Sequence, residues 1–364
     1  MSFLLGLDLW AMQSAAPPDF DDLSKRASAA LASNPAEAAI LYRQAVALRP
    51  EWTEGWFYLG ASLFQTNQYA EAQKALQKAS TLAPTRGTVW GLLGLSEAET
   101  GDSRRALADI RKGEALGLAD DPKFVSAVRN RAAQICIHEA DFSAAVQQLR
   151  PLAKAGDKSP TTIQALGISV LSIPSDPAHL PPAKLAFIEA AGQAAWAFYA
   201  QNDAEAGALL QQLTSRYPSE PGVHYLYGLY LLASDSVAAR REFGKELHLS
   251  PTNAAPRLQI AILDIQAGKP QEASQLAQDA LRVDSQNALA HLVMGRALLD
   301  EKSFAQAVPE FQAAAKLSPE NAEAHLYLEQ AYRHLGKSEE ARREREEFDR
   351  RKAASDPTVF NQAR

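Results

Sequence analysis

The sequence predicts an all-α fold in which helical hairpins repeat along the chain and stack into a solenoid. The most regular copy of the repeat carries a fixed series of large and small residues: Trp56, Leu59, Gly60, Leu63, Ala72, Leu76, Ala79 and Pro84. Trp90, Leu93 and Gly94 repeat its beginning 34 residues later. Within each copy the apolar residues recur at helical intervals. Hydrophobic content is 46% and comes from Ala and Leu more than from Val and Ile, which favours helix.

Each copy contains two helices that cannot bury their apolar stripes alone, whereas stacked copies share one core. A period of about 34 residues with this pattern resembles the tetratricopeptide repeat family. The resemblance implies an α-solenoid of helix-turn-helix repeats that forms a right-handed superhelix. It also implies that the first helices line a concave groove, and that this groove binds a peptide or protein segment.

Residues 1–18 are expected to form an N-terminal tail or a signal-like segment. The stretch from Phe3 to Trp10 is mostly apolar, but it has no preceding Lys or Arg and Asp8 interrupts it. Export therefore stays open beside a weakly helical tail, and the localisation is cytoplasmic or exported to the periplasm. Elsewhere there is no run of about 20 apolar residues, so no transmembrane span is predicted.

The repeats are expected in two blocks. Residues 19–172 form the N-terminal block, whose most faithful unit is 53–86. A proline-rich loop at 173–182 interrupts the array, because four prolines in ten residues do not fit a helix. Residues 183–355 form the C-terminal block, which ends in a polar capping helix, and residues 356–364 form a tail. Small residues should let paired helices approach closely, and prolines should end second helices, at Pro50, Pro84, Pro218, Pro251 and Pro319.

The sequence carries no persuasive catalytic or metal-binding pattern. His138-Glu139 lacks the second histidine of a zinc-protease helix, and Cys136 is the single cysteine. His224, His291 and His325 occupy the repeat position of Trp56 and are expected to pack. No enzyme activity, cofactor or metal is predicted. A net charge of -6 gives nucleic-acid phosphates no reason to bind.

The groove positions of the first helices are largely apolar. One subgroup of the family binds the C-terminal carboxylate of heat-shock chaperones through Lys and Asn; here the corresponding residues are Phe57, Ala61, Gly91 and Leu95, so this chain departs from that subgroup. The residues expected on or near a peptide-binding groove are Phe57, Phe64, Leu95, Phe198, Tyr225, Leu229, Leu232, Leu258, Ile262 and Arg296. Such a surface suits an amphipathic helix or an extended apolar segment.

These observations predict a non-catalytic scaffold that binds a protein or peptide partner. Two alternatives stay open. One is an accessory subunit of a bacterial envelope assembly system or of a glycan or lipid enzyme system. The other is a structural repeat protein that assembles with itself. The sequence does not identify the partner or the oligomeric state.

Overall fold

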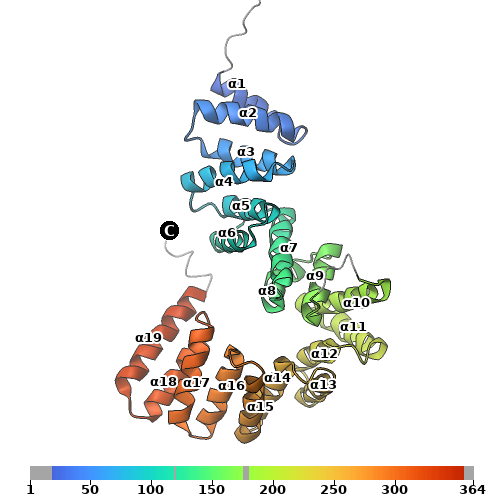
Figure 1. Cartoon of the computed structure of the whole chain (residues 1–364), viewed down its shortest axis with the longest axis vertical. Coiled ribbons are helices and arrows are strands. Elements are labelled where there is room, and N and C mark those ends of the chain that lie inside the picture. Colours follow the sequence, from blue (N-terminus) through green and yellow to red (C-terminus); the bar gives the residue numbers. More distant parts are fainter. Residues whose placement is uncertain (1–18, 119, 175–179, 356–364) are drawn as a thin grey trace, which may run out of the picture. The chain divides into compact units, whose positions relative to one another are not determined.

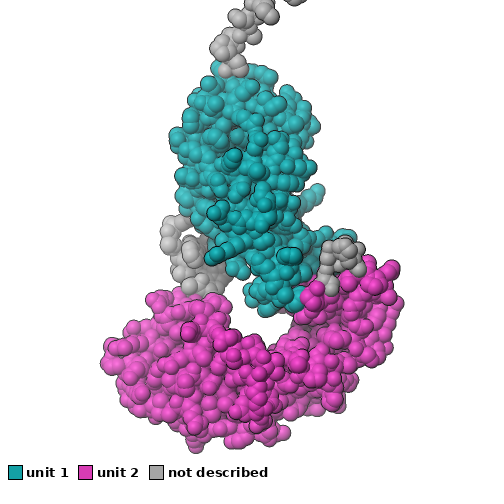
Figure 2. All heavy atoms as spheres, in the orientation of Figure 1, with its two compact units in different colours: residues 1–165 teal, residues 166–364 magenta. Residues whose placement is uncertain are grey.

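The computed structural model describes residues 19–118, 120–174 and 180–355, and Figure 1 shows that they are arranged as packed helices. This described part holds 19 α-helices and no strand, which confirms the predicted all-α solenoid. The expected tails at 1–18 and 356–364, and residues 175–179 of the proline-rich loop, lie outside the described residues. The chain divides into two compact units, 1–165 and 166–364, coloured separately in Figure 2, and the division falls within α9 (Pro160–Leu171).

Unit 1 is built from successive antiparallel helix pairs. Their bounds are α1 Phe20–Ala30, α2 Pro35–Leu48, α3 Thr53–Gln65, α4 Tyr69–Leu82, α5 Gly87–Glu99, α6 Ser103–Leu116, α7 Pro122–His138 and α8 Phe142–Lys154. Each first helix packs on the second helix of its own pair, and α2, α4 and α6 each pack on the first helix of the next pair.

Unit 2 repeats this arrangement. Its helices are α10 Pro182–Tyr199, α11 Asp203–Arg216, α12 Val223–Leu231, α13 Ser236–Leu249, α14 Ala254–Gln266, α15 Pro270–Val283, α16 Ala288–Asp300, α17 Phe304–Leu317, α18 Glu323–His334 and α19 Ser338–Ser355. The last helix, α19, is strongly polar and carries helix-spaced ion pairs such as Arg345–Asp349 at 3.2 Å.

Small residues hold the two helices of a pair close together. A Cβ atom placed on Gly60 would lie 2.5 Å from Cγ of Leu76, and one on Gly295 would lie 2.6 Å from the ring of Phe311. Both distances are shorter than real carbon contacts. Glycine therefore stands at this repeat position because the large side chain of the second helix occupies the space of a methyl group.

A second repeated contact ties each first helix to the turn before it. The indole N–H groups of Trp56 and Trp90 donate to the carbonyls of Pro50 and Pro84, at 2.8 and 2.9 Å. In unit 2 the same bond, six residues apart, is made by His224 Nε2 to Pro218 at 3.0 Å, by Arg257 to Pro251 at 2.8 Å and by His291 Nε2 to Ser285 at 3.2 Å. Indole, imidazole and guanidinium groups thus make the same bond at one repeat position.

The first helices lie on the inner side of each curved row of pairs. Within the units, α3 contacts α5, α14 contacts α16, and α16 contacts α18. No two second helices of the described chain make a comparable contact with one another. First helices are therefore closer together than second helices, so each row curves towards them.

Candidate binding surfaces

The groove residues predicted in unit 1 differ in how far they are exposed. Phe57 on α3 is 9% exposed, and the Arg86 guanidinium lies 4.8 Å from its ring centroid. Leu95 on α5 is buried in the same core. Phe64, near the end of α3, is half-buried, and its ring centroid lies 5.3 Å from that of Tyr69.

Unit 2 brings three of the predicted residues together. Tyr225 and Leu229 on α12, and Leu232 directly after it, are half-buried and pack on one apolar cluster around Phe243. Burial raises the pKa of Tyr225, and the side chain of Gln259 on α14 acts on it in the opposite direction. These side chains therefore form a continuous apolar surface that reaches the next first helix.

The remaining predicted residues lie on α10, α14 and α16. On α14, Leu258 is buried at 1% exposure whereas Ile262 is half-buried. On α16, the Arg296 guanidinium donates to the Tyr327 hydroxyl at 2.7 Å and pairs with Asp300 at 3.4 Å. Phe198 on α10 lies 6.2 Å, centroid to centroid, from Tyr230. Phe198 is therefore part of a separate aromatic group on the α11 side of α12.

The tyrosines of α12 are directed to two sides of the helix. Tyr230 donates its hydroxyl to the carbonyl of Asp203 at 3.0 Å, and its ring stacks on Tyr227. Tyr225 instead packs on Phe243 of α13, with 5.7 Å between ring centroids. Only Tyr225 therefore belongs to the apolar surface around Leu229.

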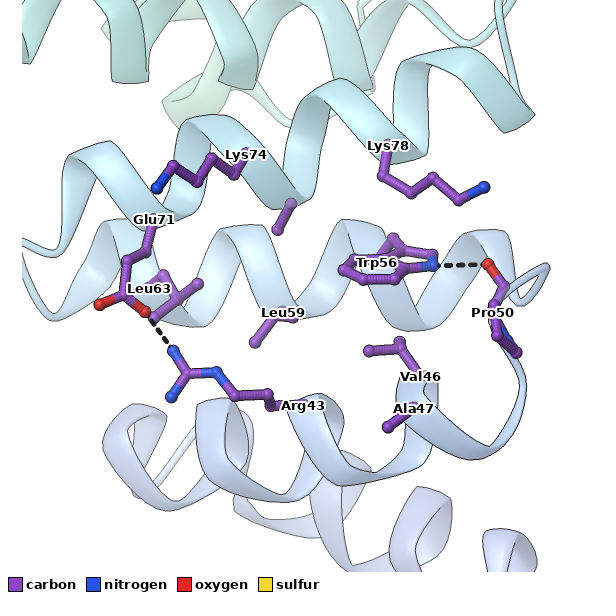
Figure 3. A pocket seen from close by; sticks show the side chains of 11 residues that line it. Arg43, Val46, Ala47, Pro50, Trp56, Leu59, Leu63, Glu71, Lys74 and Lys78 are labelled. Atoms are coloured by element: carbon purple, nitrogen blue, oxygen red, sulfur yellow. Dashed lines mark hydrogen bonds and ion pairs between the residues drawn. The ribbon is translucent and has the colours of Figure 1, made fainter.

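A groove that none of the predicted residues lines runs between the second helices α2 and α4 (Figure 3). Its volume is about 750 Å³, and Trp56, Leu59 and Leu63 of α3 form its floor. An ion pair between Arg43 and Glu71 joins its two walls. On its outer, second-helix side the repeat therefore has an apolar floor between charged edges.

One repeat further along, an acid replaces the last leucine of that floor. Trp90, Leu93 and Glu97 of α5 stand at the positions of Trp56, Leu59 and Leu63. Glu97 is 2% exposed. Its Oε1 lies 3.4 Å from Nε2 of Gln73 on α4, and no donor in the described part of the chain bonds to its Oε2.

The group that meets Glu97 is a second carboxyl, Asp109 on α6. Burial, and then the charge of Asp109, raise the pKa of Glu97 to about 7. The pKa of Asp109 is raised as well, chiefly by burial. One proton shared between the two carboxyls relieves their repulsion. We refer to Gln73, Glu97 and Asp109 as the acid pocket.

In unit 2 the equivalent acids have cationic or imidazole partners. Asp264 stands at the repeat position of Glu97, and Arg240 of the preceding second helix forms an ion pair with it. The repeat position of Asp109 is held by Glu242, Glu310 and Glu344, each 2.6 or 2.7 Å from a histidine Nδ1 on the first helix of its pair: His224, His291 and His325.

The residues of the acid pocket are not among the catalytic or groove residues that the sequence predicts. The signal was present, because Glu97 falls 34 residues after the buried Leu63 and thus at a core position. A charged residue at a repeat position that is otherwise buried and apolar is the signal that identifies the pocket.

Cys136 is buried, and burial raises its pKa to about 11, so its thiol is a poor nucleophile. Among the described residues there is no cluster of three or more His, Cys, Asp or Glu that would hold a metal ion. None of the described helices combines the length and the apolar character that a membrane crossing requires.

Comparison with known proteins agrees with this repeat geometry. Models of the tetratricopeptide repeat match residues 53–86, and also residues 258–310 and 292–347. The chain carries tetratricopeptide repeats. Repeats of this kind form protein-interaction scaffolds, and this repeat protein has the architecture of one. No curated protein matches its sequence.

Similar solved structures include the MamA protein of MSR-1, with 18% identity and a TM-score of 0.38 over 47% of this chain and 99% of that one. The P58(IPK) TPR domain has 15% identity and a TM-score of 0.30 over 88% and 99% of the two chains. A tetratricopeptide repeat protein from Parabacteroides merdae has 12% identity and a TM-score of 0.35 over 77% and 98%.

Proposed function

We propose that this repeat protein is a non-catalytic scaffold that binds a peptide or protein segment on the inner side of unit 2. The binding residues are Tyr225, Leu229, Leu232, Ile262 and Arg296, which we call the first-helix surface. The partner is a segment that presents apolar side chains, as an amphipathic helix or as an extended strand.

The observation that carries this proposal is the incomplete burial of large side chains on successive first helices. Tyr225 is half-buried, whereas Phe57 and Leu258 at the same repeat position are buried. Leu229 and Ile262 are half-buried, whereas Leu95 at their repeat position is buried. A half-buried aromatic or aliphatic side chain still has apolar area to lose to a partner. Tyrosine and arginine are also enriched among the side chains that dominate binding energy.

The first-helix surface carries a positive charge at one end, which favours one orientation of the bound segment. Arg296 on α16 has Asp300 and the Tyr327 hydroxyl as partners, so its guanidinium is held in place beyond Ile262. Arginine has further donors left when these two bonds are made. An acidic group of the partner is therefore expected near Arg296, with apolar side chains along α12 and α14.

The test is a comparison of two alanine variants by quantitative affinity purification and by cross-linking with mass spectrometry. Replacing Tyr225, Leu229 and Leu232 together by alanine should weaken capture of the partner by at least about tenfold, because hot-spot side chains dominate binding. The matched control replaces Val237, Val283 and Ile40, which are 66%, 52% and 56% exposed on second helices. Equal capture by both variants, with unchanged helicity, would contradict the proposal.

A further inference from the structure

The acid pocket of unit 1 contains a buried carboxylate oxygen that no donor in the described chain satisfies. Glu97 is 2% exposed, and its Oε2 is the atom without a partner. Gln73 supplies only a neutral amide to the other oxygen, at 3.4 Å. A buried carboxylate in this state is costly unless a cation or a proton meets it.

Unit 2 has a cation at the equivalent position. Asp264 is as buried as Glu97, at 2% exposure, and the guanidinium of Arg240 forms an ion pair with its Oδ1. Its Oδ2, like Oε2 of Glu97, has no hydrogen-bond partner among the described residues. The side chain of Arg240 is 46% exposed, so a guanidinium reaches this buried acid from the outer, second-helix side. In unit 1 the residue at the position of Arg240 is Gln73.

The second acid of the pocket, Asp109, meets Glu97 where its counterparts in unit 2 meet a histidine. In unit 2, the acids at the repeat position of Asp109 pair with histidines on the first helix, as His291 does with Glu310 at 2.7 Å. In unit 1 that histidine position is Trp90, whose N–H bonds to the carbonyl of Pro84. The pocket thus combines two acids whose usual partners have both been replaced by neutral side chains.

The charged groups around the pocket are otherwise engaged. Arg105 pairs with Asp102 at 3.4 Å, and Lys112 lies 3.3 Å from the ring centroid of Trp90. Both cations lower the pKa of Asp109, while the Asp102 charge acts on Glu97 in the opposite direction. Neither cation forms an ion pair with Glu97 in the described structure.

We propose that the acid pocket binds the guanidinium group of an arginine side chain presented by a partner protein. The guanidinium would enter between the second helices α4 and α6 and take the place that Arg240 takes beside Asp264. Arginine fits better than lysine, because its planar fork presents parallel donors to two carboxyl groups. This site lies on the second-helix side of unit 1 and does not depend on the first-helix surface of unit 2.

Binding of the guanidinium has a predictable dependence on pH. The pKa of Glu97 is about 7 in the free protein, so below that pH the pocket holds a proton that a cation must displace. Affinity for arginine should therefore rise as the pH rises through neutrality. A site that worked only by packing would show no such dependence.

The test is a titration of the full chain with Nα-acetylarginine amide, followed through the carboxyl ¹³C signals of Glu97 and Asp109 slightly above neutral pH. The control ligand is Nα-acetylcitrulline amide, which has the same shape and no charge. We expect saturable shifts with the arginine compound and about tenfold weaker binding of the citrulline compound. Potassium chloride at the same concentrations should leave the signals in place.

Two variants locate the effect. Gln73→Arg keeps both acids but fills the pocket from within, and Glu97→Gln removes the charge without changing the shape. Each should weaken arginine binding by about tenfold while helicity is retained. Absence of saturable shifts, equal binding of citrulline, equal shifts with potassium, or unchanged binding by Gln73→Arg would each overturn the proposal.

Discussion

Units 1 and 2 use the same repeat geometry but treat buried charge differently. Both place a glycine against a large side chain, and both tie the first helix to a carbonyl six residues earlier. Unit 2 pairs its buried Asp264 with Arg240, whereas unit 1 leaves Glu97 facing Asp109. The comparison teaches that the steric contacts of the repeat are kept in both units, whereas the partners of its buried carboxylates differ between them.

The side chain that bonds the start of the first helix to the preceding turn also differs between the units. Trp90 and His291 both donate a ring N–H to a carbonyl, at 2.9 and 3.2 Å. The smaller imidazole has a second nitrogen, and Glu310 bonds to it. Where histidine replaces tryptophan at this position, a carboxylate of the second helix bonds to its second ring nitrogen. Asp109 stands at the position of that carboxylate in a repeat that has Trp90 in place of the histidine.

The largest expected effect comes from making unit 2 resemble unit 1. Arg240→Gln leaves Asp264 buried without its cation, and removal of one partner of such a pair should lower the free energy of unfolding by about 3 kcal/mol. Urea unfolding measures the loss. The control is Arg241→Gln, which changes an exposed neighbour. Equal losses in the two variants would show that Arg240 does not stabilise the buried acid.

A smaller effect separates the two units at the glycine position. A Cβ atom on Gly94 would lie 2.8 Å from the backbone oxygen of Ala106, whereas the three atoms nearest to one on Gly295 all belong to the Phe311 ring. A ring shifts more easily than backbone, so Gly94→Ala should cost about 2 kcal/mol and Gly295→Ala about 1 kcal/mol. Thermal unfolding ranks the two. The reverse order would mean that the second-helix backbone adjusts more readily than the aromatic ring.

Making unit 1 resemble unit 2 should stabilise it and remove a dependence on pH. The pKa of Glu97 is raised above its unfolded value of 4.5 to about 7, so the native state binds more protons between these values. Its stability contribution is present below the unfolded pKa and is lost as the pH rises through about 7. In Gln73→Arg this loss of stability with rising pH should be absent. Melting temperatures measured between pH 4.5 and about pH 7 test this, with Gln73→Met as the control variant.

The smallest effect concerns the turn between paired helices. Gly101 in unit 1 and Lys302 in unit 2 hold the same turn position, with φ of 87° and 63°. Because residues with a Cβ are disfavoured there, Gly101→Ala should lose about 1 kcal/mol and Lys302→Gly should gain about 0.5 kcal/mol. Hydrogen exchange of the adjacent helices measures both. A loss of stability in Lys302→Gly would mean that the lysine side chain contributes more than its backbone strain costs.

The sequence predicted the fold because shape is repeated in it. The residue types of Trp56, Gly60 and Pro84 recur at one period. Their sizes and backbone properties predict packing between helices, close approach of two helices and the end of a second helix. The candidate site was less predictable. Leu95 and Leu229 are leucines at the same position of a first helix, yet one is buried and the other half-buried, because the neighbouring helices cover them differently.

The acid pocket was unpredictable for another reason. Glu97, Gln73 and Asp109 come from three helices, and none belongs to a motif. Comparison with the Arg240–Asp264 and His291–Glu310 pairs of unit 2 is needed to see that Glu97 and Asp109 have no cationic or imidazole partner.

The most direct measurement is the carboxyl titration of Glu97 by ¹³C NMR in the natural sequence and in Gln73→Arg. If equivalent repeat positions make equivalent contacts, Glu97 titrates near pH 7 in the natural sequence and at a clearly lower pH once the introduced guanidinium supplies the cation. An ordinary carboxyl pKa for Glu97 in the natural sequence, or an unchanged pKa in the variant, would contradict the account.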